Sequence, residues 1–315
     1  MSNKRIYLGI DTSNYTTSVA ACNEQGEVIA NIKKMLDVKA GERGLRQSDA
    51  VFSHIKNFSD IASWVREEIG DNDIVAVGVS AVPRDAVGSY MPCFLSGKAV
   101  AEMLAAVNNV PITCFSHQAG HIMAALYSSG ATDLLINKPF IAFHVSGGTT
   151  EALYVQSNGH SFDVNIVADT ADISAGQAID RVGVMMGLKF PCGKELEALA
   201  SEYEGRLPKQ RICVNDGKCN LSGLENIAQK LYKETNDKAY VSAYVLNFVA
   251  ETLIALTKQI REKYPDISIV YAGGVMSNKL LKSKLSHFEN TYFAEPQFSA
   301  DNAAGIALLT QRKYK

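Results

Sequence analysis

The sequence has no excess of basic residues. Lys and Arg number 31 against 33 Asp and Glu, so the formal net charge is −2. A protein that binds a phosphate backbone unaided usually carries a basic excess. Any contact with nucleic acid must therefore come from a partner protein or from a local patch. One candidate patch is Arg206, Lys209, Arg211 and Lys218, although a solvated charged loop is the more common role of such a segment.

Paired cysteines and long apolar runs are also missing. The 6 cysteines are scattered and form no C-x-x-C motif, which indicates free thiols in a reducing compartment. No stretch approaches the ~18 uninterrupted apolar residues of a membrane-spanning helix. The first residues run directly into a strand-like segment and leave no room for a signal peptide. We therefore expect a cytoplasmic protein that does not bind a membrane.

The composition is that of a globular protein. Apolar residues make up 47% and charged residues 20%, with only 8 prolines, which excludes a disordered, collagenous or coiled-coil chain. A length of 315 residues predicts two domains, at a usual size of ~150 residues each. A chain of this length buries about three quarters of its unfolded surface, so it needs no metal or disulfide to fold.

Short apolar runs alternate with longer segments of helical spacing. Strands are predicted at 6–10, 74–79, 140–145 and 268–272, and helices at 49–69, 96–107 and 239–260. Strands that alternate with helices predict α/β layers with a parallel component.

Two distant segments follow the same pattern. Residues 8–22 and 142–155 each read as a strand, a small polar turn that ends in Thr-Thr, and a second strand followed by a hairpin turn. Two hairpins can be similar by chance. Duplication of a domain explains more, because each copy would then open with a phosphate-binding turn.

Three turns are candidates for binding a phosphate. Small residues after a strand let backbone N–H groups converge on an anion, because no Cβ blocks the approach. A Gly-Gly turn is often only a turn, but a strand end followed by a helix favours phosphate. Asn278 follows the third turn, where it would either bind a ligand or cap the helix. The turns are Asp11-Thr12-Ser13, Ser146-Gly147-Gly148 and Gly273-Gly274.

His117 and His121 are spaced for a shared metal ion. Residues four apart lie on one face of a helix, so both imidazoles can reach one ion, although such pairs are as often structural. Gln118 stands where zinc peptidases of the H-E-x-x-H type carry their general-base glutamate, which excludes that activity. Asp301 is a candidate third ligand, with a helix N-cap as its alternative role.

Asp172, Gly176 and Asp180 recur every four residues and share one helix face. Solvent exposure is one interpretation of this face. Because the neighbouring residues are small and apolar, a cleft is the better one, in which a carboxylate could bind ribose hydroxyls or an amino acid.

Taken in order, these segments resemble the tRNA N6-adenosine threonylcarbamoyltransferase family, formerly called O-sialoglycoprotein endopeptidases. Seven motifs carry the resemblance, which runs nearly end to end. They are G-I-D-T-S at 9–13 (family G-I-E-T-S), H-Q-A-G-H at 117–121 (H-x-x-G-H), V-S-G-G at 145–148, S-A-G-Q-A-I-D at 174–180 (A-A-G-E-A-F-D), L-S-G-L at 221–224 (F-S-G-L), A-G-G-V at 272–275 with Asn278, and A-D-N at 300–302 (T-D-N).

The resemblance implies a duplicated actin/Hsp70-like (ASKHA) ATPase fold, with one subdomain at 1–113 plus 297–315 and the second at 114–296. The implied reaction transfers a threonylcarbamoyl group from threonylcarbamoyl-AMP to N6 of adenosine 37 in tRNA. One divalent ion, Fe²⁺ or Zn²⁺, would be held by His117, His121 and Asp301. The adenylate, or another adenine nucleotide, would be bound by His144, Val145, Ser146, Gly147, Gly148, Asp180, Gly193 and Asn278. No catalytic side chain is identified.

Partner proteins are also implied by the resemblance. Family members work on tRNA with a paralogous ASKHA subunit, a small P-loop ATPase and an adenylate-forming synthase. Such partners would account for the missing basic excess.

Several polar positions depart from the family. Ser13-Asn-Tyr-Thr-Thr17 replaces S-C-D-E-T, Thr149 replaces the histidine of S-G-G-H-T, and Val82-Pro-Arg-Asp85 stands where G-P-G is expected. Ile173 and Gln177 replace an aspartate and a glutamate. These changes leave two alternatives open: a metal-dependent carbamoyltransferase with an acceptor other than tRNA, or a non-catalytic nucleotide-binding scaffold. Retention of both histidines and Asp301 argues against the scaffold.

Overall fold

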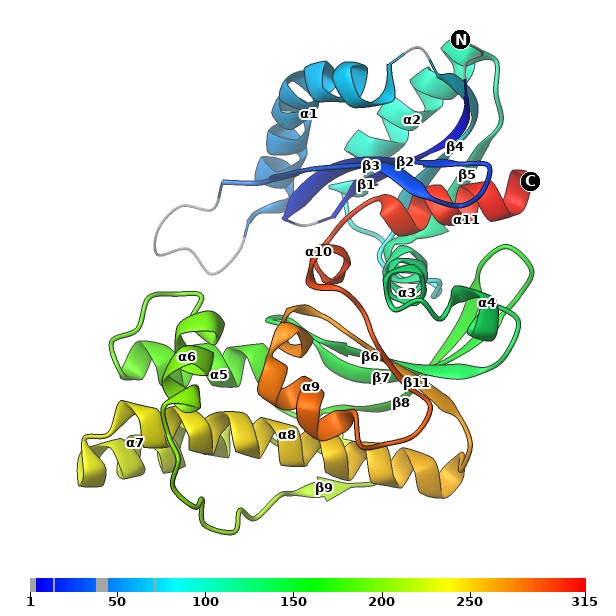
Figure 1. Ribbon diagram of the computed structural model, residues 1–315. Coiled ribbons are helices and arrows are strands. Elements are labelled where there is room, and N and C mark those ends of the chain that lie inside the picture. Colours follow the sequence, from blue (N-terminus) through cyan, green and yellow to red (C-terminus); the bar gives the residue numbers. More distant parts are fainter. Residues whose placement is uncertain (1–3, 14, 38–44, 71) are drawn as a thin grey trace. The chain divides into compact units, whose positions relative to one another are not determined.

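The computed structural model describes residues 4–13, 15–37, 45–70 and 72–315. Residues 1–3 and Asn14, on which two sequence expectations partly rest, lie outside these ranges. The chain divides into two compact units (Figure 1). Unit 1 comprises Met1–Ser128, Ser157–Asp163 and Gln297–Lys315, and unit 2 comprises Ser129–Gln156 and Val164–Pro296. We propose that they correspond to the two copies of a duplicated domain.

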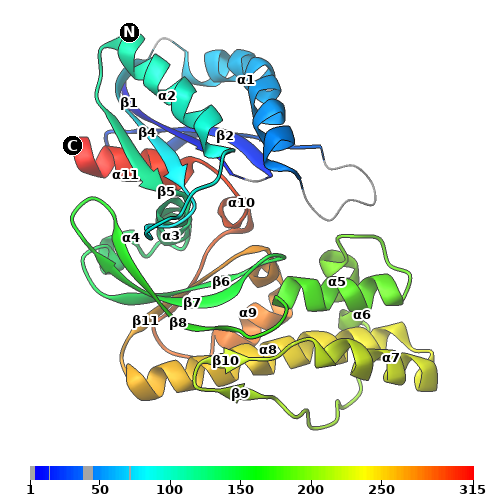
Figure 2. The same cartoon turned by 180° about the vertical axis from the view of Figure 1, so that it is seen from behind.

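Unit 1 is built on a five-stranded sheet with the order β3-β2-β1-β4-β5. β1, β2 and β3 are antiparallel neighbours, and β4 and β5 continue the sheet in parallel. Helices α1 and α2 cover one face, and α3 and α11 cover the other (Figure 2). The bounds are β1 Arg5–Thr12, β2 Thr16–Asn23, β3 Val28–Met35, α1 Gln47–Ile69, β4 Asp73–Val82, α2 Phe94–Asn108, β5 Ile112–Ser116, α3 His117–Ser128 and α11 Ala304–Tyr314.

Glycines allow the helices of unit 1 to pack unusually close. A Cβ on Gly9 of β1 would lie 2.4 Å from the backbone nitrogen of Ala307, so α11 can cross β1 only where β1 has no side chain. A Cβ on Gly305 would lie 1.8 Å from the carbonyl oxygen of Gly120, which places the start of α11 against α3. These contacts bring the chain just before α11 to the two histidines of α3.

Unit 2 is built around a seven-stranded sheet with the order β12-β11-β6-β7-β8-β10-β9. β6 pairs in parallel with β11, with Ala272 opposite His144, and antiparallel with β7. The strands are β6 Phe140–Val145, β7 Thr150–Ser157, β8 Phe162–Thr170, β9 Val214–Asn215, β10 Lys218–Cys219, β11 Ser268–Ala272 and β12 Thr291–Phe293. The helices are α4 Thr132–Leu135, α5 Ala175–Met185, α6 Gly193–Ser201, α7 Gly223–Thr235, α8 Lys238–Lys263, η1 Gly274–Ser277, α9 Lys279–Leu285 and, at the boundary with unit 1, α10 Pro296–Ser299.

The predicted α/β architecture is confirmed. Every predicted strand and helix lies within an observed one, and parallel pairs occur in both sheets. The internal repeat also has a structural counterpart. The order β3-β2-β1-β4 in unit 1 matches β8-β7-β6-β11 in unit 2, with the parallel neighbour at the same place.

Helix α8 is long and apolar enough to cross a membrane when judged by those two properties alone. However, 67% of its apolar window is buried within the protein. Val241, Val245 and Val249 are among its buried residues, and they join the hydrophobic core of unit 2. This burial is typical of a core helix.

Candidate metal centre and ligand-binding loops

The three predicted metal ligands meet in unit 1. His117 and His121 lie one turn apart on α3, and Asp301 lies between α10 and α11. His121 Nε2 is 2.9 Å from His117 Nε2 and 3.1 Å from Asp301 Oδ1, and His117 Nε2 is 3.6 Å from the same oxygen. Among the described residues, this is the one group of three His, Cys, Asp or Glu residues close enough to share a metal ion.

The start of α3 is fixed by hydrogen bonds from the preceding strand. Ser116, the last residue of β5, accepts a hydrogen bond from the Ala119 N–H at 3.1 Å through its Oγ. The same hydroxyl donates to Asp85 Oδ2 at 2.6 Å. Asp85 belongs to the segment that replaces the family's G-P-G. This departure therefore supports the helix that carries both histidines.

Asp11, a predicted phosphate-turn residue, contacts the ring nitrogen of His117 that does not face His121. Its side chain is 1% exposed, and its Oδ2 is 2.7 Å from His117 Nδ1. Ser80 donates its hydroxyl proton to the same oxygen, and the Ser13 N–H donates to Oδ1 at 3.0 Å. Ser13 Oγ in turn donates to Asp301 Oδ2 at 2.9 Å.

Thr12, the middle residue of that turn, also has its side-chain hydroxyl hydrogen-bonded within unit 1. Its hydroxyl donates to the carbonyl of Cys93 at 3.0 Å and accepts the Gly97 N–H at 3.1 Å. The side chains of the turn are thus engaged in unit 1. The sequence interpretation did not identify Ser80 or the bond from Asp11 to His117. The available signal was a polar residue near the carboxyl end of each of two largely apolar strands: Asp11 in β1 and Ser80 in β4.

The charges of the cluster are strongly coupled. Burial alone would lower the pKa of His117, but the carboxylates of Asp11 and Asp301 outweigh burial and raise it to about 10. Burial would raise the pKa of both aspartates. Charge and hydrogen bonding from His117, and from His121 at Asp301, instead hold both pKa values below their ordinary range. Without a metal ion, the two carboxylates therefore stabilise a positive charge on His117.

The donor set fits a divalent metal ion. Two imidazole nitrogens and one carboxylate oxygen face one another, and these ligand types suit zinc, iron(II) or manganese. Three protein ligands also leave positions for a substrate, as in catalytic metal sites. The chemistry of the residues is therefore consistent with the predicted metal site.

In unit 2, the segment 144–148 comprises the end of β6 and a turn in which Gly147 and Gly148 are exposed. The turn is closed by a hydrogen bond from the Ser146 N–H to the Thr149 carbonyl at 2.8 Å. Ser146 Oγ accepts the Gly148 and Thr149 N–H groups at 3.4 and 3.1 Å. A Cβ on Gly147 or Gly148 would meet nothing within 4 Å, so a ligand can approach both backbones.

The start of helix α5 packs against this loop. A Cβ on Gly176 would lie 2.6 Å from Gly147 Cα, so the helix reaches the loop only because residue 176 has no side chain. Ser174 donates its hydroxyl to the Gly147 carbonyl at 2.7 Å and forms a capping box with Gln177. Gln177 accepts the Ser174 N–H through its amide oxygen, so this departure from the family's glutamate preserves the cap.

The Gly273-Gly274 turn lies beside the same loop. Gly273 has a φ of +102°, and a Cβ there would lie 2.2 Å from the Val145 carbonyl oxygen. Asn278 Oδ1 accepts the Leu281 N–H at 3.1 Å and caps α9. The capping role considered from the sequence is therefore present in the structure.

Asp180 lies on α5 opposite the start of α6. Its Oδ1 accepts the Cys192 N–H at 2.8 Å, which places it next to Gly193. Burial raises the pKa of Asp180, and the bond from Cys192 only partly offsets this effect. Asp172, in contrast, precedes α5, so the predicted helix face shared with Gly176 and Asp180 is wrong for this residue. Its carboxylate is instead engaged by the loop before α7. It accepts the Leu221 N–H at 2.9 Å and the Ser222 hydroxyl at 2.6 Å.

One contact near these loops was not predicted from the sequence. Glu197 of α6 accepts the Lys279 N–H at 2.7 Å through its Oε1. This bond ties α6 to the start of α9, immediately after Asn278. An acidic residue on an amphipathic helix gives no signal of such a role, because it resembles any solvated charge.

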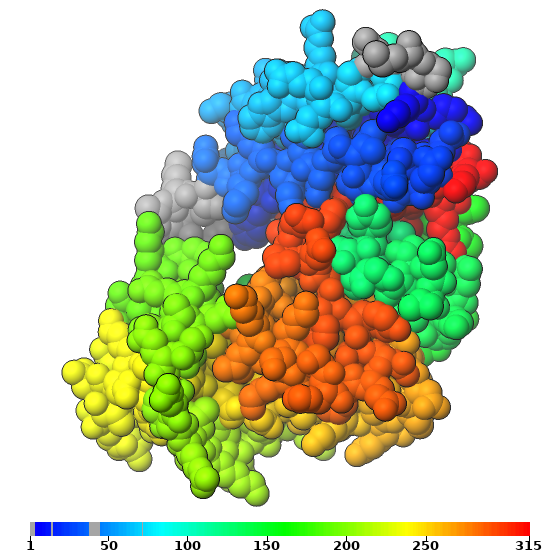
Figure 3. All heavy atoms as spheres, viewed as in Figure 1, coloured from blue at the N-terminus to red at the C-terminus, as the bar shows by residue number. Residues whose placement is uncertain are grey.

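Two other surface features of unit 2 lie apart from these loops. Segment 202–211 lies on the surface (Figure 3), with Arg206, Lys209 and Arg211 exposed, while Lys218 forms an ion pair with Asp169.

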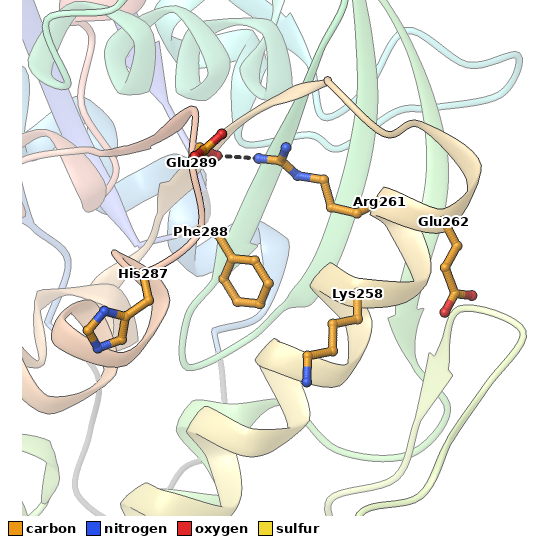
Figure 4. Close-up of a pocket in the computed structure, with 6 residues that line it drawn as sticks. All are labelled: Lys258, Arg261, Glu262, His287, Phe288 and Glu289. Atoms are coloured by element: carbon orange, nitrogen blue, oxygen red, sulfur yellow. Dashed lines mark hydrogen bonds between the residues drawn. The ribbon is translucent and has the colours of Figure 1, made fainter.

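A shallow depression lies between the end of α8 and the chain that follows α9 (Figure 4). There Arg261 donates to the carbonyls of Pro265 and Glu289, so it holds the chain rather than a ligand. The depression is lined by Lys258, Arg261, Glu262, His287, Phe288 and Glu289.

Comparison with known proteins identifies relatives along the whole chain. The family model described as tRNA N6-adenosine threonylcarbamoyltransferase matches residues 27–308. A protein of that name from Streptococcus suis strain 05ZYH33 is 30% identical over 327 aligned residues, which cover 100% of this chain and 94% of the relative. The counterpart from Streptococcus sanguinis strain SK36 is 31% identical, covering 90% of this chain and 83% of the relative.

Solved structures support the fold class. Component A of (R)-2-hydroxyglutaryl-CoA dehydratase from Acidaminococcus fermentans superposes with a TM-score of 0.54 at 18% identity, covering 98% of each chain. A ROK family glucokinase from Streptomyces griseus gives a TM-score of 0.54 at 12% identity, covering 98% of this chain and 99% of the glucokinase. Both are ASKHA-type proteins, so the predicted actin/Hsp70-like fold is confirmed.

Proposed function

Because the chain belongs to the tRNA N6-adenosine threonylcarbamoyltransferase family, we propose that it is an acyltransferase that forms threonylcarbamoyladenosine in tRNA. The donor in this proposal is threonylcarbamoyl-AMP, and the acceptor is N6 of adenosine 37. The observation that carries the proposal is the convergence of His117, His121 and Asp301, whose ligand atoms lie within 4.8 Å of one another.

The reaction sets two demands on the protein. The N6 amine attacks the carbamoyl carbon, the bond from that carbon to the phosphate oxygen breaks, AMP leaves with the electron pair, and N6 loses a proton. An exocyclic amine is a poor nucleophile. The site must therefore polarise the carbonyl group and stabilise the charge on the departing phosphate.

In unit 1, His117, His121 and Asp301 would hold one divalent ion, Fe²⁺ or Zn²⁺. When bound, such an ion supplies Lewis acidity and a template for the substrate oxygens. Each of the three residues offers one ligand atom to it. The absence of a glutamate at position 118 leaves no carboxylate for peptide hydrolysis by the H-E-x-x-H mechanism.

In unit 2, the loop 144–148 and the Gly273-Gly274 turn would bind the adenylate. The open backbone at Gly147 and Gly148 supports this role, because an anion can approach the peptide groups without meeting a Cβ. Asp180, Gly193 and Asn278 would contact the remainder of the ligand. Another adenine nucleotide, such as AMP, would occupy the same place. We assign no general base.

The partners in this proposal are tRNA, a paralogous ASKHA subunit and a small P-loop ATPase, all acting in the cytoplasm. The net charge of −2 supports the need for partners, since the chain alone lacks the basic excess typical of proteins that bind nucleic acid unaided.

Mass spectrometry of nucleosides tests the proposal. Unmodified tRNA is incubated with the protein, threonylcarbamoyl-AMP and the companion proteins from the same cell. A His117→Ala/His121→Ala double variant serves as the control. We expect threonylcarbamoyladenosine with the wild-type protein and none with the double variant.

Three other outcomes would contradict parts of the proposal. If no product forms while the Streptococcus suis relative is active in the same assay, the acceptor is not tRNA, and a related carbamoyltransferase activity becomes the better assignment. If the double variant forms the product normally, the metal role is wrong. If the adenylate binds but is never consumed with any acceptor, the chain is a scaffold.

A further inference from the structure

We propose that Asp11 and Ser13, in the turn that the sequence suggested as a phosphate loop, are positioning residues for the metal ligands. The inference rests on the metal role proposed above for His117, His121 and Asp301. It assigns to the first turn of unit 1 a function that does not involve phosphate.

The first argument concerns the two nitrogens of His117. Nδ1 lies 2.7 Å from Asp11 Oδ2, where a carboxylate can only accept, so Nδ1 carries a proton and donates it. Nε2 is then the nitrogen that offers a lone pair when a metal ion displaces its proton, and it faces Nε2 of His121 at 2.9 Å. Asp11 thus selects which nitrogen of His117 points into the cluster.

The second argument concerns the two oxygens of Asp301. Ser13 Oγ donates to Oδ2 at 2.9 Å, while Oδ1 faces His121 Nε2 at 3.1 Å. Ser13 therefore holds one oxygen and leaves the other directed at the histidines. The turn acts in the same way on both ligands, because in each it engages the polar atom that points away from the cluster.

The third argument is that Asp11 has no freedom to turn toward another ligand. Its carboxylate receives three hydrogen bonds, from His117 Nδ1, the Ser80 hydroxyl and the Ser13 N–H, and its side chain is 1% exposed. A buried carboxylate in the turn would also repel a phosphate. The Ser13 N–H, which an anion would need, is already donated to Asp11.

Asp11→Asn is the variant that tests this role. An amide has one oxygen acceptor, so it cannot accept all three hydrogen bonds and leaves at least one donor unsatisfied. We expect the affinity for Zn²⁺, measured by competition with a chromophoric chelator, to fall about 10–100-fold, as is typical when an outer partner of a metal ligand is lost. Ser13→Ala should show a smaller decrease, because Asp301 keeps both its charge and its place.

Asp172→Asn provides the matched control. Asp172 is a carboxylate of unit 2 that also accepts several hydrogen bonds, from the backbone and side chain of the loop before α7. This variant should lose stability and retain wild-type Zn²⁺ affinity. If its affinity falls as far as that of Asp11→Asn, the effect is a general consequence of destabilisation and the positioning role is wrong.

A spectroscopic readout covers the case in which Asp11→Asn does not fold. In the Zn²⁺-loaded wild-type protein, nitrogen-15 NMR should show His117 protonated at Nδ1, and Ser13→Ala should retain this signal while binding Zn²⁺ more weakly. Protonation at Nε2, or a folded Asp11→Asn variant with wild-type affinity, would overturn the inference. These measurements use neither tRNA nor adenylate, so they stand apart from any failure of the transferase assay. Failure of the wild-type protein to bind Zn²⁺ would overturn both the metal role and this inference.

Discussion

The candidate site of unit 1 consists of side chains, whereas that of unit 2 consists mainly of backbone groups. In unit 1, side chains from α3 and the segment before α11 face one another at 2.9–3.6 Å, and buried partners hold them from behind. In unit 2, the candidate site is exposed backbone, and its shape depends on glycines that allow close approach. Removing polar atoms should therefore damage the first site, and adding carbon atoms should damage the second.

The largest effect is expected from removal of a proposed ligand in unit 1. His117→Ala should lower the affinity for Zn²⁺ by at least about 100-fold. Loss of an outer partner of a metal ligand lowers metal affinity by up to about 100-fold, and loss of the ligand itself should lower it further. Calorimetric titration with Zn²⁺ measures this effect. AMP binding should stay at the wild-type value, since the proposed nucleotide loops belong to unit 2. A parallel loss of AMP affinity would contradict the division of roles between the units.

The matching change in unit 2 is Gly273→Ala. The added Cβ would lie 2.2 Å from the Val145 carbonyl oxygen, at a φ of +102°. Backbone strain and the clash should lower the free energy of unfolding by about 3 kcal/mol, measured by urea denaturation.

Its neighbour Gly274 supplies the control, because a Cβ there meets nothing within 4 Å. Gly274→Ala should change the free energy of unfolding by less than about 0.5 kcal/mol. If a ligand approaches this turn, the same variant should still weaken AMP binding. Equal destabilisation by the two alanines would show that the close approach of Gly273 to Val145 does not determine the conformation of this turn.

A pH dependence is expected for the metal-free protein. The pKa of His117 is raised from 6.5 to about 10, so the folded state binds its proton more tightly than the unfolded state does. The resulting stabilisation is complete below pH 6.5 and is lost as the pH rises through about 10. Urea denaturation in EDTA should show that the wild-type protein has a higher free energy of unfolding than His117→Gln at pH 6.5. This difference should shrink as the pH rises toward about 10. An advantage that grows with pH would contradict the ion pairing with Asp11 and Asp301.

The smallest effect is expected for Gln177→Glu, which restores the family's residue at the start of α5. A glutamate can accept the same hydrogen bond from Ser174 and adds a negative charge near a helix N-terminus. We expect a gain of about 0.5 kcal/mol in the free energy of unfolding and no change in Zn²⁺ affinity. A loss of stability would indicate that a neighbouring negative charge faces position 177.

The sequence was informative where a local pattern decides the outcome. Apolar runs identified the central strands, four-residue spacing placed His117 and His121 on one helix face, and small residues identified the loops of unit 2. The partners of those residues were not visible in the sequence. Asp11 is 106 positions from His117 and Ser13 is 288 from Asp301, so their contacts depend on strand pairing and helix packing. Glu197 resembled a solvated charge, and its partner Lys279 is 82 positions away.

The most direct test of the central claim is threonylcarbamoyladenosine formation by protein stripped of metal and then titrated with Zn²⁺ or Fe²⁺. The nucleoside is measured by mass spectrometry in the presence of the companion proteins. We predict no product from the stripped protein, recovery that saturates at one ion per chain, and no recovery with His117→Ala. Full activity of the stripped protein, or recovery in the variant equal to wild type, would contradict the account.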